Sequence, residues 1–170
     1  MITATANRLR WLFYFLEAIL VTLAMTALSA GDQAAWRRVI RASQATVLRR
    51  QPWGTRHRLL GQATSSAAFE AALQLPAHSY LLLQGRAVVG CVTLRVDQVE
   101  NAATIETMAL RPHVNTAANR AEVVAAAIAF AHQWYVSRLV VTPPAEWTDQ
   151  VAAAGFTQES AGAAWVRPIV

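Results

Sequence analysis

The 170-residue sequence predicts an α/β fold, with a central mixed β-sheet flanked by helices and a hydrophobic helix at the N-terminus. The first observation is a short apolar, partly β-branched run, 104–110, that Pro112 separates from an alanine-rich helical segment, 117–136. The second is a pair of strand-like runs, 79–83 and 87–96, joined by a short turn that contains glycine. A chain of this length is sufficient for one domain with a hydrophobic core.

Weaker signals predict the other elements, which are helices at 33–50, 65–75 and 145–154 and strands at 139–142 and 164–167. The strand at 139–142 is expected to run parallel to the strand at 104–110, because a crossover helix connects them. Asn115, Thr116 and Asn119 are the candidate N-caps of that crossover helix.

Residues 11–30 form an almost unbroken apolar run whose single charge is Glu17. A helix of this length spans about 30 Å, the thickness of a bilayer core. The run fits a transmembrane helix or a helix buried against other subunits, and in both cases we expect it not to pack on the chain's own sheet. A cleaved signal peptide is disfavoured, because Leu28 stands where a small residue is required. The residues expected to face lipid or partner subunits include Trp11, Phe15, Leu20 and Leu28.

The chain is basic, and its positive charge is concentrated in the first third. Residues 1–62 carry nine arginines and two acidic residues, a net charge of +7, whereas residues 63–170 carry a net charge of −2. This asymmetry predicts an anionic partner, which is a lipid surface, a nucleic acid or an acidic protein face; a simple solvated helix face is the alternative. The arginines expected to make the contact are Arg37, Arg38, Arg41, Arg49 and Arg50, extended by Arg56 and Arg58.

Cysteine and histidine content limits the chemistry of the chain. Cys91 is the only cysteine, so no intrachain disulfide can form, and we expect it to be a small core residue. The four histidines lack the spacing of metal ligands, and no metal site is predicted. A reducing, cytoplasmic-type environment therefore stays open.

The order and spacing of the elements between residues 79 and 167 resemble the acyl-CoA-dependent N-acetyltransferase (GNAT) superfamily. The strand end at 108–112 is similar to the family's strand that closes on an apolar-x-proline run, and Gly155 with Phe156 is similar to its Leu-Gly-Phe signature. The resemblance implies a GNAT-like central mixed sheet. The chain would then comprise a hydrophobic helix in residues 1–30, a basic helical segment in residues 31–62 and a GNAT-like domain in residues 63–170.

In the GNAT family, the loop after this strand contains glycines, and its backbone amides hold the pyrophosphate of coenzyme A. The resemblance places Asn115, Thr116, Ala118 and Arg120 in that loop. Ala118 stands where the family has the first glycine of the loop, and Arg120 stands where it has the second. Glycine lets the backbone approach phosphate closely. Because the Arg120 side chain would occupy that space, we expect no cofactor; acetyl-CoA would be the cofactor if the domain were active.

The resemblance also identifies the catalytic positions. The tyrosine that serves many members as general acid lies four residues before the glycine of the Leu-Gly-Phe signature, where this chain has Val151, which has no proton to give. Glu106 matches the glutamate that often serves as general base. The alternative, which we favour, is a strand glutamate that faces solvent or pairs with Arg95.

These losses predict a non-catalytic acetyltransferase-like domain that serves as a structural or interaction module. Its N-terminal helix would hold it in a membrane or in a multi-subunit assembly, of which a phage virion is one example, and the protein would be oligomeric. Two alternatives stay open. One is an active, membrane-anchored N-acyltransferase that uses acetyl-CoA, and the other is a nucleic-acid-associated protein that uses the arginine-rich segment.

Overall fold

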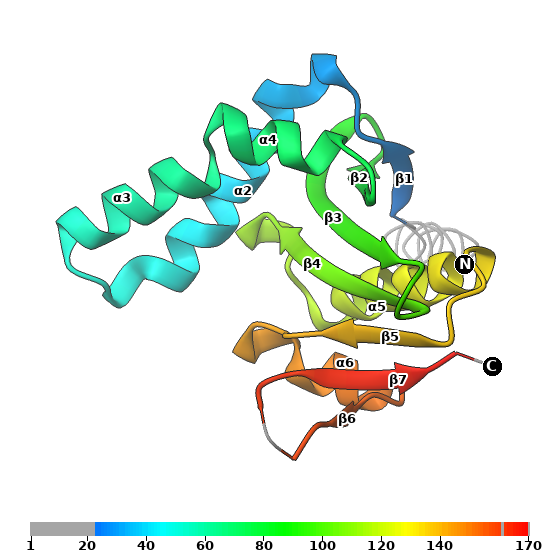
Figure 1. Cartoon of the computed structure of the whole chain (residues 1–170). Coiled ribbons are helices and arrows are strands. Elements are labelled where there is room, and N and C mark those ends of the chain that lie inside the picture. Colours follow the sequence, from blue (N-terminus) through cyan, green and yellow to red (C-terminus); the bar gives the residue numbers. More distant parts are fainter. Residues whose placement is uncertain (1–22, 161, 170) are drawn as a thin grey trace, which may run out of the picture.

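A seven-stranded mixed sheet organises the chain, with helices on both faces (Figure 1). The computed structural model describes residues 23–160 and 162–169. Along the sheet the strands lie in the order β1-β2-β3-β4-β5-β7-β6. Their bounds are Ala24–Ala27 (β1), Ala77–Gln84 (β2), Ala87–Asp97 (β3), Ala102–Leu110 (β4), Arg138–Val141 (β5), Thr157–Gln158 (β6) and Trp165–Pro168 (β7).

Five α-helices and four short 3-10 turns connect the described strands. The helices are Gln33–Val47 (α2), Trp53–Ala63 (α3), Ser66–Leu73 (α4), Ala117–Gln133 (α5) and Thr148–Ala153 (α6). The turns are Ala30–Asp32 (η1), Leu48–Arg50 (η2), Pro112–Val114 (η3) and Ala145–Trp147 (η4). The fold class predicted from the sequence is therefore confirmed for the sheet and its helices, while α3 and β6 were not predicted.

The centre of the sheet is the antiparallel meander β2-β3-β4. Its first turn contains Gly85, whose φ of +61° lies in the left-handed region that glycine adopts without a steric penalty. The predicted hairpin is thus confirmed. The ladder between β3 and β4 shifts register between Thr93 and Leu94, which leaves Glu106 as an extra residue on β4.

The expected N-terminal helix is wrong for the part of the run that the structure describes. Residues 24–27 form β1, which pairs antiparallel with β2 and so belongs to the domain's own sheet. Leu28 donates its backbone N–H to the Ser79 carbonyl and packs against the hydrophobic cluster around Trp36. An apolar run is compatible with a strand as well as with a helix, and here pairing with β2 stabilises the strand. Trp11, Phe15 and Leu20 lie outside the described residues.

Each face of the sheet has its own hydrophobic cluster. On one face, Val123, Val124 and Phe130 of α5 pack with Val92 and Leu94 of β3 in a cluster that also includes residues of α6. On the other face, a smaller cluster joins helices α2 and α4 to the strands; its buried members are Trp36, Val39, Ile40, Phe69, Ala72, Leu81, Cys91 and Ala109. The basic helical segment is therefore part of the same fold as the sheet, through the buried side of α2.

Strand β5 returns to the sheet after the α5 crossover and runs parallel to β4, as predicted. The pairing is short, and joins Ala102–Ile105 of β4 to Arg138–Val141 of β5. Beyond Ile105, β4 continues to Leu110 with only β3 beside it in the ladder. No helix in the described part of the chain is both long enough and apolar enough to cross a bilayer.

The tight packing at the centre of the meander predicts that Gly90→Ala destabilises the protein. A Cβ at Gly90 would lie 2.6 Å from the Ala109 carbonyl oxygen and 2.8 Å from Leu82 Cδ1, well inside van der Waals contact. Overpacking of this kind typically costs about 1–3 kcal/mol, and urea denaturation measures it.

Gly61→Ala is the matched control, because no atom lies within 4 Å of the added Cβ and Gly61 lies within helix α3. This variant should gain about 0.5–1 kcal/mol of stability, since alanine favours a helix over glycine. Equal stability changes in the two variants would contradict the packing described for β3.

Candidate functional site

The candidate site lies where β4 and β5 separate. Two segments flank this opening: the loop from η3 to the start of α5, which follows β4, and the turn from η4 to α6, which follows β5. A helix N-terminus beside an open strand end is a natural anion site, because its first amides have no partner within the helix and its dipole favours negative charge.

Thr116 is the residue that caps α5. Its hydroxyl oxygen accepts the Asn119 backbone N–H at 3.2 Å, and its carbonyl oxygen accepts the Arg120 N–H at 3.0 Å. Asn119 is not a cap; its side-chain amide donates to the Val114 carbonyl at 2.7 Å and stiffens the loop. Ala117 and Ala118 are exposed on the first turn and provide its remaining backbone donors.

The Arg120 side chain crosses from the loop to helix α6. Its Nε donates to Gln150 Oε1 at 2.8 Å, and one terminal nitrogen donates at 3.0 Å to both the carbonyl and the side-chain oxygen of Asn115. Asn115 in turn donates its side-chain amide to Glu146 Oε1 at 2.9 Å. Two links therefore tie the segment after β4 to the segment after β5, and Arg120 takes part in one of them.

Hydrophobic side chains fill the space behind these links. Val114 of η3, Trp147 of η4 and Val151 of α6 are all buried in the same cluster as Leu110. Val151 is 0% exposed, so the position at which the resemblance places a general acid points into the core rather than toward a substrate. Sequence reasoning identified the valine at this position, and the structure adds its burial.

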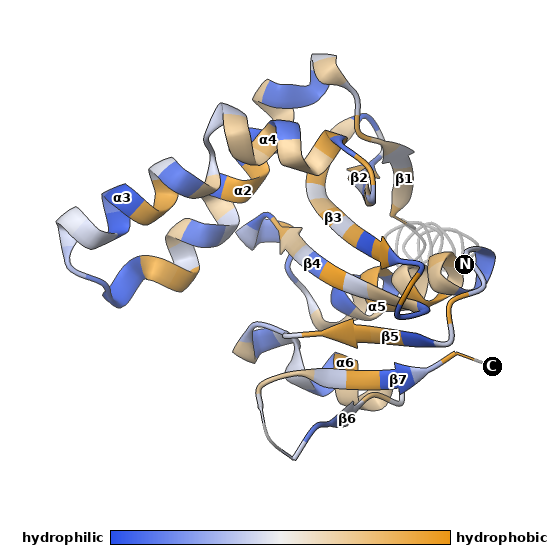
Figure 2. Ribbon diagram, viewed as in Figure 1, coloured by the Kyte–Doolittle hydropathy of each residue, from blue (hydrophilic) through white to orange (hydrophobic). Residues whose placement is uncertain are grey.

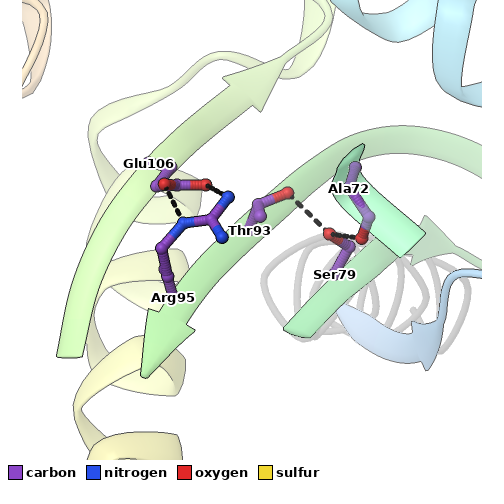
Figure 3. A network of polar contacts seen from close by, with 5 residues as sticks. All are labelled: Ala72, Ser79, Thr93, Arg95 and Glu106. Carbon is purple, nitrogen blue, oxygen red and sulfur yellow. Dashed lines mark hydrogen bonds and ion pairs between the residues drawn. The ribbon is translucent and has the colours of Figure 1, made fainter. Parts of the chain in front are cut away.

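Glu106 lies on the side of the sheet that α2 and α4 cover, where it forms an ion pair with Arg95 (Figure 3). Arg95 Nε is 2.5 Å from Glu106 Oε1, and a terminal nitrogen of Arg95 donates to Oε2 at 3.1 Å. Since both carboxylate oxygens accept from Arg95, removing a proton from an amine would require the pair to open. The predicted pairing with Arg95 is confirmed.

Next to this pair is a cavity of about 220 Å³ beneath α2 and α4. Its wall includes Trp36, Gln44, Thr93, Arg95 and Glu106. Thr93 shares a 2.8 Å hydrogen bond with Ser79, whose hydroxyl also bonds the Ala72 carbonyl at 2.6 Å, so these strand hydroxyls are held in place (Figure 3). The cavity could admit a small polar molecule, and nothing in the sequence pattern indicated it.

The predicted anion-binding arginines divide into two groups. Arg38, Arg41, Arg49 and Arg50 are exposed on α2 and η2. Arg37 is half-buried and donates to the Ser66 hydroxyl at 2.9 Å, so it connects α2 to α4. The hydrogen bonds of Arg120 and Glu106 described above involve none of these arginines.

The sequence predicted one loop containing Asn115, Thr116, Ala118 and Arg120, whereas in the structure Ala118 and Arg120 lie in the first turn of α5. The partners Glu146 and Gln150 were not predicted. Their contacts to the loop span 31 and 30 residues of sequence. Polar residues on the turn after a short strand are too common to indicate such partners. Within the described residues, no group of three histidine, cysteine or acidic side chains is arranged to hold a metal ion.

No protein-family model matches the sequence, and no curated protein matches it. Solved structures do match. The PaiA N-acetyltransferase of Thermoplasma acidophilum, solved with coenzyme A, superposes with a TM-score of 0.69 at 12% identity, over 85% of this chain and 96% of the other. An acetyltransferase of Thermus thermophilus gives a TM-score of 0.65 at 19% identity, over 88% and 98%.

The domain has the GNAT fold. The ribosomal-protein-S18-alanine N-acetyltransferase of Escherichia coli matches as well, with a TM-score of 0.63 at 15% identity over 86% of this chain and 94% of that one. The predicted resemblance is thus confirmed for the fold, and it extends well beyond residues 79–167. Identities this low establish the GNAT fold alone and carry no activity with them.

Cys91 lies in the buried cluster beneath α2 and α4. Burial raises the pKa of its thiol to about 12, so at neutral pH the thiolate that would act as a nucleophile is essentially absent. Cys91 is therefore a core residue of this GNAT-fold domain, as the sequence predicted.

The burial of Cys91 predicts that the native protein reacts slowly with a thiol-specific reagent such as dithionitrobenzoate at pH 8. We expect the rate to be at least roughly 100-fold below that of the chain unfolded in guanidinium, where the thiol recovers an ordinary pKa near 8.5. The chain has one cysteine, so the absorbance change reports this residue alone. A native rate within a few-fold of the unfolded rate would contradict the buried position.

Proposed function

We propose that this GNAT-fold domain does not transfer acyl groups and that it serves as a structural or interaction module. The observation that carries the proposal is the Arg120 side chain, which lies across the start of the loop and bonds to Asn115 and Gln150. In an acetyltransferase of this fold, the same loop would have to receive the pyrophosphate of coenzyme A. The fit to that group is poor, because the position that the resemblance reserves for a small residue carries an arginine whose guanidinium is bonded to Asn115.

Two further features support the same conclusion. Val151 is fully buried, so no side chain at that position can protonate a leaving thiolate. The Glu106 carboxylate is bonded to Arg95 through both oxygens, which opposes a role as general base. Loss of one proton donor or acceptor typically costs about 10²–10⁴ in rate, and loss of cofactor positioning removes the binding energy on which the remaining catalysis depends.

Attachment to a membrane or to a multi-subunit assembly is the part of the proposal that rests on sequence alone. Its support is the apolar run before Leu23, which includes Trp11, Phe15 and Leu20. A virion is one such assembly. Residues 24–27 form β1 of the domain's own sheet, and Leu28 donates its N–H to the Ser79 carbonyl, so the proposed attachment concerns the run before them.

An active N-acyltransferase is the second candidate, and a specific observation favours it. The strand separation after Ile105 and Val141 and the Thr116-capped helix are retained, and two of the matching structures were solved with coenzyme A. If Arg120 left Asn115 and turned outward, its charge would suit phosphate. The cavity beside Arg95 and Glu106 would then be the candidate binding site for the acyl acceptor.

Isothermal titration with coenzyme A separates the two candidates. We expect the wild-type protein to show no binding at micromolar concentrations, because Arg120 occupies the loop. Arg120→Ala and Arg120→Gly remove the guanidinium and should gain measurable binding, with alanine the better-folded of the two within helix α5.

Arg86→Gly is the matched control, since it makes the same chemical change at the exposed β2–β3 turn. It should bind no better than wild type. Micromolar binding by the wild-type protein, together with acetylation of an amine, would overturn the proposal and establish the second candidate.

A further inference from the structure

The hairpin formed by α2, η2 and α3, hereafter the arm (residues 33–63), projects from the sheet (Figure 1). Only its base is anchored, through Trp36, Val39 and Ile40 of α2, which are buried against β3 and β4. Helix α3 contributes no buried residue and packs on α2. The arm is thus held at one end, and its turn lies far from the core.

The arm carries positive charge without compensation. The sequence contains no acidic residue between Asp32 and Glu70, and five arginines of the arm are exposed: Arg38, Arg41, Arg49, Arg50 and Arg58. The ion pairs found in residues 23–160 and 162–169 involve Arg95 and Arg138, so no arginine of the arm is neutralised by a carboxylate there. Figure 2 shows hydrophilic colour along much of α3 and the turn before it.

Two apolar side chains are exposed among these charges at the tip of the arm. Val47, the last residue of α2, is 53% exposed, and Trp53, the first residue of α3, is 72% exposed. Arg49 and Arg50 lie between them in the sequence. The Trp53 ring stacks on His57, with the ring centroids 5.3 Å apart, which holds the indole in position on the tip.

We propose that the tip of the arm docks on an anionic lipid surface. Arg49, Arg50 and Arg58 would contact headgroup phosphates, while Trp53 and Val47 enter the boundary between headgroups and acyl chains. Tryptophan and arginine together are the residue types that this boundary favours. The proposal goes beyond the function proposed above and does not depend on whether coenzyme A binds.

The tip fits a lipid surface better than a nucleic acid for two reasons. His57 already stacks on Trp53 with the ring centroids 5.3 Å apart, so a base would have to share the indole with the imidazole. The exposed aliphatic side chain of Val47 gains nothing from contact with a charged phosphate backbone. Its burial at the boundary between headgroups and acyl chains is favourable. Nucleic-acid binding is accordingly an outcome of the test and not part of the proposal.

The test is flotation of the full chain with two kinds of vesicle, phosphatidylcholine alone and phosphatidylcholine mixed with phosphatidylglycerol. We expect binding to the anionic vesicles and a decrease as salt is added. Arg49→Gln with Arg50→Gln should lower the partition coefficient roughly 30-fold, from about 1 kcal/mol per arginine near an anionic surface. Trp53→Ala should lower it as well.

Matched controls distinguish the tip from the rest of the surface. Arg86→Gln with Arg138→Gln removes the same charge outside the arm, and Tyr135→Ala removes an aromatic ring that is 90% exposed outside the arm. Both should bind as wild type does. All variants keep the N-terminal apolar run, so attachment through that run would leave the tip and control variants equal.

Three results would overturn the proposal: equal binding to both kinds of vesicle, unchanged binding by the tip variants, or preferential binding of duplex DNA in a parallel gel-shift measurement. Salt titration of the wild-type protein decides the question if a tip variant fails to fold, because salt-independent binding excludes the electrostatic contact. Vesicle flotation and the coenzyme A titration measure different properties. The proposal of lipid docking and the proposal of a non-catalytic domain can therefore fail independently.

Discussion

The separation of β4 from β5 positions the loop before α5 and the turn before α6 on the two sides of one opening. The two strands pair through Ala102–Ile105 and Arg138–Val141, after which β4 continues beside β3 only. Whatever occupies the opening determines whether the domain can hold a ligand there. In this chain hydrophobic side chains fill the space behind it, and polar links from Arg120 and Asn115 connect its two sides.

These links give the positive charge beside a helix N-terminus a structural use. The first turn of α5 would ordinarily attract an anion through free amides. Arg120 adds a cation to that turn, but Asn115 and Gln150 already accept its hydrogen bonds. The charge of this segment thus serves to join α5 to α6, while the exposed arginines of the arm provide a separate positive surface on the other side of the sheet.

The meander, the α5 crossover and its parallel return strand could be predicted from the sequence, because periodicity and the proline and glycine stops are local signals. Strand β1 could not, since an apolar run suits a helix as well as a strand and only pairing with β2 decides between them. The segment from Asn115 to Arg120 could be singled out as a candidate site, although residues from Ala117 onward belong to α5 and not to a loop. The hydrogen bonds that connect this segment to Glu146 and Gln150 could not be predicted, because the fold brings these residues together and no local sequence pattern indicates it.

A crystal structure determined from protein saturated with acetyl-CoA would show directly whether the first turn of α5 receives the cofactor. We expect Arg120 still to donate to Asn115 and Gln150, with no phosphate against the amides of Ala117 and Ala118. A pyrophosphate seated on those amides, with the Arg120 side chain displaced from Gln150, would contradict this expectation.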